Sequence, residues 1–108
     1  MSLDETTFRR IVTDALRQLS RRIDAIESDA FDARLSDGVL QVDFEVGGTF
    51  VLSQQVPVRE LWLSAWSRAW HFCWSDAGWT ERDTGVPLED VLSDIWQKKL
   101  GFAVDFRR

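Results

Sequence analysis

The apolar residues in the first quarter of the chain recur at the three- and four-residue spacing of an amphipathic helix. They fall at positions 8, 11, 12, 15, 16, 19, 23 and 26, which places them along one side of a helix. The pattern predicts a helix from Leu3 to Ile26, and Ser2 and Glu5 have the spacing of a capping box at its start. The solvated residues of this helix include Arg9, Arg10, Arg17 and Arg21.

A second helical pattern lies near the end of the chain. Apolar residues at positions 88, 91, 92, 95, 96 and 100 predict a helix over Pro87–Leu100, because proline suits the first position of a helix. Gly101 stands where a C-terminal cap belongs. We expect the segment Phe102–Phe106 to be a final strand or an extended tail packed on the core.

Apolar and polar residues alternate after the first predicted helix. Phe31–Leu35 and Val39–Glu45 alternate in the way that is typical of strands with one buried face. The residues between them, Asp37-Gly38, have the composition of a two-residue hairpin turn. Gly47-Gly48 marks a second turn, and Thr49–Leu52 is predicted to be a third strand.

The segment 58–73 supports two interpretations. Its apolar positions 58, 61, 62, 65, 66, 69, 70 and 73 form a helical series after a helix-compatible Pro57, so periodicity alone favours a helix. The alternative is two strands, which the aromatic content favours, joined by a turn near residues 67–69. In that arrangement Trp62 and Ser64 face outward, and a set of apolar side chains faces inward: Leu61, Leu63, Trp70, Phe72 and Trp74.

Length and composition predict one globular domain over residues 1–108. A hydrophobic fraction of 44% with six Trp and seven Phe favours a packed core, and no apolar run approaches the roughly 18 residues of a membrane span. The first residues lack the features of a signal peptide. A single cysteine, Cys73, excludes an internal disulfide and a cysteine-built metal centre. We therefore expect a cytoplasmic protein.

One acidic segment accounts for the net charge of −5. Residues 24–45 contain seven carboxylates and one arginine. This balance argues against nucleic-acid binding, which requires clustered Lys and Arg. It favours the binding of cations or of a basic protein surface. The candidate metal ligands are Asp24, Glu27, Asp29 and Asp32. Because carboxylates suit ions such as Fe²⁺ or Ca²⁺ and the single His lies far along the chain, we expect a shallow, exchangeable site. The alternative is a solvated acidic face without a metal.

The stretch from Gln55 to Ser64 resembles the signature of the frataxin family. Gln55-x-Pro57 is followed, after three residues, by Leu61-Trp62-Leu63-Ser64. The resemblance continues through Trp70-His71-Phe72, Gly78-Trp79 and residues 83–92. Two local departures are Ser53, where the family usually has Asn, and Arg68-Ala69, which replaces a glycine-containing turn. The acidic segment is also less acidic than is usual for the family, because Arg21, Arg22 and Arg34 lie beside or among its carboxylates.

The resemblance implies a two-layer α/β (α+β) sandwich with two helices packed on one face of an antiparallel sheet of five to seven strands. It thereby replaces the helical interpretation of 58–73. It also implies an iron-binding accessory of iron–sulfur cluster assembly, which binds Fe²⁺ or Fe³⁺ weakly on the acidic residues. Its implied partners are the cysteine desulfurase and the scaffold protein, with no membrane partner, and its implied state is a monomer that can oligomerise with iron.

Four residues are expected to contact these partners: Gln55, Trp62, Trp66 and His71. In the strand interpretation Trp62 lies on the open side of the sheet, with Trp66 beside it, and exposed tryptophans are typical of binding hot spots. The alternative is that Trp62 packs beneath a loop or helix. His71 and Cys73 alternate on one strand, but two ligands leave a tetrahedral metal site half empty, so a structural or incidental role is favoured for this pair.

Two other functions stay open. In the first, the protein is an enzyme, a ferroxidase whose carboxylates hold Fe²⁺ while oxygen takes its electrons. In the second, it is an acidic adaptor for protein partners with no metal role. Thermal unfolding with and without Fe²⁺ separates the adaptor from the iron-binding protein, since a bound ion stabilises the fold.

Overall fold

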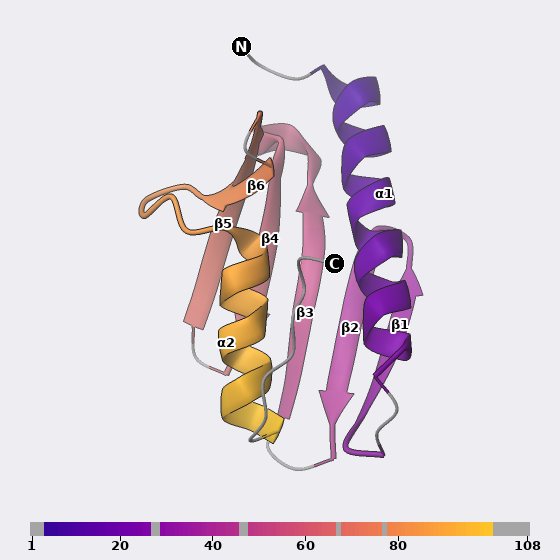
Figure 1. The fold of residues 1–108 in the computed structure, drawn as a ribbon. Helices are drawn as coiled ribbons and strands as arrows, with labels where there is room; N and C mark the ends of the chain where they lie inside the picture. Colours follow the sequence, from indigo (N-terminus) through magenta and orange to yellow (C-terminus); the bar gives the residue numbers. More distant parts are fainter. Residues whose placement is uncertain (1–3, 27–28, 46–47, 67, 77, 101–108) are drawn as a thin grey trace.

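Two helices lie side by side on one face of an antiparallel sheet in the computed structural model (Figure 1). The structure describes residues 4–26, 29–45, 48–66, 68–76 and 78–100. Within these ranges the helices are α1 (Glu5–Asp24) and α2 (Leu88–Leu100). Six strands follow one another across the sheet in chain order: β1 (Phe31–Ser36), β2 (Val39–Phe44), β3 (Gly48–Gln55), β4 (Glu60–Ala65), β5 (Arg68–Ser75) and β6 (Gly78–Glu81). The predicted two-layer sandwich is confirmed.

The start of α1 is capped by Asp4. Its Oδ1 accepts a hydrogen bond of 2.7 Å from the backbone N–H of Thr7, which satisfies one of the unpaired donors of the first turn. The predicted cap residue, Ser2, lies outside the described residues.

The start of α2 is one residue later than predicted. Pro87 pairs with Thr80 in an isolated antiparallel bridge, and the helix begins at Leu88. Gly101 and the segment Phe102–Phe106 lie outside the described residues.

Residues 60–65 and 68–73 form strands, so the helix that periodicity favours over this segment is wrong. A short 3-10 helix, η1 (Val56–Val58), and the left-handed Arg59 (φ 54°) turn the chain into β4. β4 and β5 pair in a hairpin whose turn contains a second left-handed residue, Trp66 (φ 57°). Their inward side chains include three that are fully buried: Leu61, Leu63 and Phe72. Sheet burial thus overrides the local period, as packing commonly does for strands.

Trp96 of α2 joins the helix layer to the sheet. Its fully buried ring lies 4.8 Å from that of Phe50, 5.6 Å from that of Phe44 and 5.8 Å from that of Phe31, measured between centroids. Edge-to-face pairs of this kind each contribute about 0.5–1.5 kcal/mol beyond the burial of their area. The apolar stripe of α1 covers the neighbouring part of the same face with Phe8, Val12, Leu16, Leu19 and Ile23.

The opposite face of the sheet, here called the open face, has no helix over it in the part of the chain that the structure describes (Figure 1). Strand pairing brings the outward residues of β3, β4, β5 and β6 into lateral rows. The rows around the middle of this face contain Ser53, Gln55, Glu60, Trp62, His71, Cys73 and Thr80. Neither described helix is long and apolar enough to span a membrane.

Candidate functional site

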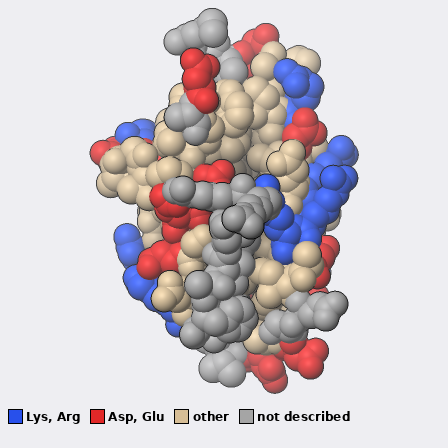
Figure 2. Space-filling view, viewed as in Figure 1, with Lys and Arg blue, Asp and Glu red and all other residues tan. Residues whose placement is uncertain are grey.

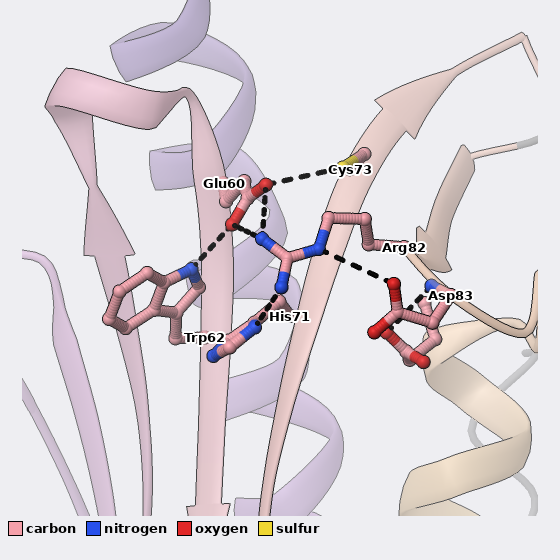
Figure 3. Close-up of polar contacts among 7 residues, drawn as sticks. Glu60, Trp62, His71, Cys73, Arg82 and Asp83 are labelled. Atoms are coloured by element: carbon pink, nitrogen blue, oxygen red, sulfur yellow. Dashed lines mark hydrogen bonds and ion pairs between the residues drawn. The ribbon is translucent and has the colours of Figure 1, made fainter.

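A cluster of polar side chains surrounds Trp62 on the open face (Figure 3). Trp62 lies directly opposite His71 in the pairing of β4 with β5, and Glu60 lies opposite Cys73. Arg82, the residue after β6, completes the group from the adjacent edge of the sheet. Alternation places Glu60 and Trp62 on the same side of β4, since their neighbour Leu61 is buried on the other side.

The carboxylate of Glu60 is the buried charge of this cluster. The residue is only 7% exposed, and its Oε1 accepts a hydrogen bond of 2.7 Å from the indole N–H of Trp62. The Arg82 guanidinium donates to both carboxylate oxygens, at 3.4 and 3.3 Å. The thiol of Cys73 donates weakly at 3.7 Å. A buried carboxylate is tolerated when donors satisfy its oxygens in this way.

The imidazole of His71 is held between Trp62 and Arg82. Its ring centroid lies 4.5 Å from that of the Trp62 ring, with 40° between the planes. Its Nδ1 lies 2.9 Å from Nη2 of Arg82. Because a guanidinium can only donate, Nδ1 is the acceptor, and we infer that His71 is the neutral tautomer with its proton on Nε2.

The environment of Cys73 disfavours the thiolate. Burial is the main cause that raises the pKa of the thiol, and the charge and hydrogen bond of Glu60 raise it further. The nearby Arg82 only partly opposes this effect. Because the thiolate is the nucleophile and the metal ligand, Cys73 is poorly suited to either role at neutral pH, in line with the structural role expected for it.

Among the residues expected to contact partners, Gln55 and His71 share the open face with Trp62, whereas Trp66 does not lie beside it. Gln55 is opposite Glu60, and its Nε2 donates to the hydroxyl of Ser53 at 3.1 Å. Trp66 lies in the β4–β5 turn with 53% of its surface exposed. Its ring lies 5.9 Å from Nζ of Lys99 in α2 and lines the same hollow as Ile95. Trp66 therefore lies on the helix side, and its expected position beside Trp62 is wrong.

The acidic candidate ligands are exposed and spread over three elements. Asp24 ends α1, Asp29 lies in the following turn, and Asp32 is on β1, all exposed; Glu27 lies outside the described residues. Within the described ranges, no three His, Cys, Asp or Glu side chains form a metal-binding group. Figure 2 shows Lys and Arg side chains gathered along the α1 edge with acidic ones among them, and Arg21 and Arg22 occupy the last turn of α1.

Asp43 is a further carboxylate next to these candidates, directly opposite Asp32 in the pairing of β1 with β2. Its oxygens accept hydrogen bonds from Thr49 at 2.7 Å, Gln41 at 3.1 Å and Arg34 at 2.9 Å. The hydrogen bonds from Thr49 and Gln41, with the charge of Arg34, hold the pKa of Asp43 below its ordinary value. Asp43 is therefore ionised but already hydrogen-bonded, so Asp32 is the candidate carboxylate on this edge with fewer competing contacts.

Glu60 and Arg82 are the site residues that sequence reasoning missed. Glu60 could have been found, because it is two residues before Trp62 and must share its side of a strand. Arg82 could not have been found in that way, since its contact with Glu60 spans 22 residues and depends on the β5–β6 pairing.

The chain is similar in sequence to frataxin-like proteins over nearly its whole length. The sequence model of the family described as frataxin-like domain matches residues 1–102. The iron–sulfur cluster assembly protein CyaY of Azotobacter vinelandii is 34% identical over 110 residues, covering 98% of this chain and 97% of that protein. The protein of the same name from Vibrio cholerae is 29% identical over 104 residues, covering 96% and 99%.

Solved structures show the same fold. Frataxin from Psychromonas ingrahamii matches with a TM-score of 0.90 at 18% identity, covering 98% of this chain and all of that one. Trimeric frataxin from the yeast Saccharomyces cerevisiae, complexed with ferrous iron, matches with a TM-score of 0.63 at 24% identity, covering 94% and 89%. At such identities the likeness establishes the fold alone.

The raised pKa of Cys73 predicts slow alkylation of its thiol at neutral pH. Glu60→Gln removes the charge that stabilises the protonated thiol, so the pKa of Cys73 should fall and the thiolate fraction at a given pH should rise. The rate of reaction with iodoacetamide, followed over a pH series, measures this: its midpoint reports the pKa and its plateau reports access. Asp83→Asn is the control, because Asp83 contacts Arg82 and contributes nothing to the shift of Cys73. An unmoved midpoint in Glu60→Gln contradicts the account.

Proposed function

Because this chain belongs to the frataxin-like domain family, we propose that it is an accessory of iron–sulfur cluster assembly that docks on the cysteine desulfurase and its scaffold protein. The CyaY relatives, which it matches over nearly its whole length, carry the name of iron–sulfur cluster assembly proteins. The docking surface is the open face around Trp62, where Gln55 and His71 lie beside it. Trp66, whose ring lies near Lys99 of α2, contacts only a partner that also reaches the helix side of the molecule.

The placement of Trp62 is the observation that carries this proposal. Its indole lies on the face that no described helix covers, yet its N–H is already paired with Glu60 and its ring already packs against His71. A large aromatic side chain held in a fixed orientation is the usual anchor of a protein interface, because little conformational entropy remains to be lost on binding.

Weak binding of iron as cargo is the second part of the proposal. The exposed carboxylates Asp24, Asp29 and Asp32, with Glu27, supply the hard oxygen donors that iron accepts. Their exposure, and the arginines at the end of α1, favour a shallow site in which water completes the coordination. The yeast frataxin complexed with ferrous iron supports iron as the ion. Iron held in this way is delivered to the assembly complex or changes the rate of sulfur transfer there.

Trp62→Ala is expected to lower the affinity for the cysteine desulfurase–scaffold complex by about tenfold or more, the loss typical of a truncated interface anchor. Its effect on folding should be small, because Trp62 lies outside the helix-side core. Calorimetric titration of the folded variant with the purified complex measures the affinity. Trp74→Ala is the matched control, since Trp74 is a partly exposed tryptophan on the other face of the sheet, paired with the buried Trp79. Equal losses in both variants would contradict docking through the open face.

The double substitution of Asp29 and Asp32 by Asn should weaken Fe²⁺ binding by roughly tenfold, because two of the oxygen ligands lose their charge. The same change should slightly raise the thermal midpoint of the iron-free protein, since it removes repulsion between like charges. Anaerobic NMR titration measures the broadening of nearby backbone signals by Fe²⁺. Asp76→Asn, an exposed acid in the β5–β6 turn, is the control. Unchanged binding in the double variant, or broadening centred elsewhere, contradicts the proposed iron site.

A further inference from the structure

Arg82 contacts both of the side chains that hold Trp62 in place (Figure 3). One support is Glu60, which accepts the indole N–H at 2.7 Å. The other is His71, whose ring packs against the indole at 4.5 Å. The guanidinium of Arg82 donates to the Glu60 carboxylate with one nitrogen and to Nδ1 of His71 with another. A single side chain therefore fixes the partners of both the polar and the aromatic part of the Trp62 indole.

The backbone of Arg82 is itself anchored to the sheet. Its N–H donates to the carbonyl oxygen of His71 at 2.8 Å, which extends the pairing of β5 beyond the end of β6. The loop that follows is closed by hydrogen bonds of 2.8 Å from Gly85 N–H to the Glu81 carbonyl and from Glu81 N–H to the Val86 carbonyl. Arg82 thus starts from a fixed position, although 46% of its side chain is exposed.

We propose that Arg82 is a positioning residue for the open face: it orients Trp62 and His71 for docking through its contacts with Glu60 and the imidazole. The inference rests on the proposed function, since docking is what the orientation serves. A planar guanidinium suits this task better than an ammonium, because its donors form a rigid fork that reaches two acceptors at once.

The contact of Arg82 with Glu60 also lowers the cost of covering the open face with a partner. A partner that seals the open face removes water from Glu60, and a buried carboxylate without donors is strongly unfavourable. With Arg82 in place, Glu60 keeps its ion pair and its indole donor when the partner binds. Without Arg82, docking must bury a carboxylate that has lost its cation, and the Trp62 and His71 rings each lose a restraint.

The test compares Arg82→Met with Arg34→Met. Arg34 is the matched control, because it forms an arginine–carboxylate pair with Asp43 at 2.9 Å on the same face of the sheet, three strands away from Trp62. Three readouts are taken on folded protein: the indole N–H signal of Trp62 by NMR, the tautomer of His71 from its ring nitrogen shifts, and the affinity for the purified cysteine desulfurase–scaffold complex by calorimetry.

Arg82→Met is expected to move and broaden the Trp62 indole signal, to let the Nδ1–H tautomer of His71 appear beside the Nε2–H form, and to lower the affinity about tenfold. Arg82→Lys should recover only part of each effect, because an ammonium cannot serve both acceptors in the same geometry. Arg34→Met should leave all three readouts near those of the unsubstituted protein. A purely structural role would lower the thermal midpoint of Arg82→Met without moving the tautomer or the affinity.

Two outcomes separate failure of this inference from failure of the proposed function. If the unsubstituted protein does not bind the complex, the proposed function is wrong. If it binds and folded Arg82→Met binds equally well with an unmoved indole signal, only the role of Arg82 is overturned. Should Arg82→Met not fold, the double variant Glu60→Gln with Arg82→Met removes the unpaired charge while keeping an acceptor for the indole. The Nδ1–H tautomer of His71 must appear in that variant as well, and a pure Nε2–H form overturns the inference.

Discussion

Burial of one face of the sheet beneath α1 and α2 fixes which side chains the other face presents. On β4, the packing of Leu61 and Leu63 into the core forces Glu60 and Trp62 outward, because successive residues of a strand point to opposite sides. Pairing then sets their neighbours, so His71 faces Trp62 across the hairpin. A shift of one residue in this register would exchange the two faces, which is why the proposed docking surface is as firmly specified as the core itself.

The open face has a charged centre in place of an apolar one. Glu60 is buried beneath the surface that Trp62 presents, and its donors come from three different strands or strand ends. Such a group contributes little net stability, since its desolvation offsets most of its attraction to Arg82. Its contribution is to orientation, because it holds the Trp62 indole and the Arg82 guanidinium, and Arg82 in turn contacts the His71 imidazole. The packing of the helices on the sheet supplies most of the stability, and the cluster on the open face fixes the orientation of Trp62.

The sequence predicts the elements that the local spacing of apolar residues defines, but it does not predict contacts between residues far apart in the chain. Both helices and the first strands can be predicted from the spacing of apolar residues alone. The strands within residues 58–73 could be predicted only from the family resemblance, because large apolar residues on both faces of this hairpin give the spacing of a helix. Trp66 is misplaced by the same reasoning, since its left-handed conformation at the turn is invisible in the apolar pattern. The contact of Arg82 with Glu60 depends on the pairing of three strands. The acidic segment can be identified from the sequence, but the hydrogen bonds that Gln41 and Thr49 donate to Asp43 cannot.

In the proposed complex, the partner covers the open face around Trp62. Hydroxyl-radical footprinting with mass spectrometry tests this most directly, because the partly exposed tryptophans report on different parts of the surface: Trp62 on the open face, Trp66 at the hairpin turn and Trp74 on the helix side. Addition of the cysteine desulfurase–scaffold complex should protect Trp62 and His71 from oxidation and leave Trp74 unchanged. Protection of Trp74 with no change at Trp62 would contradict the account.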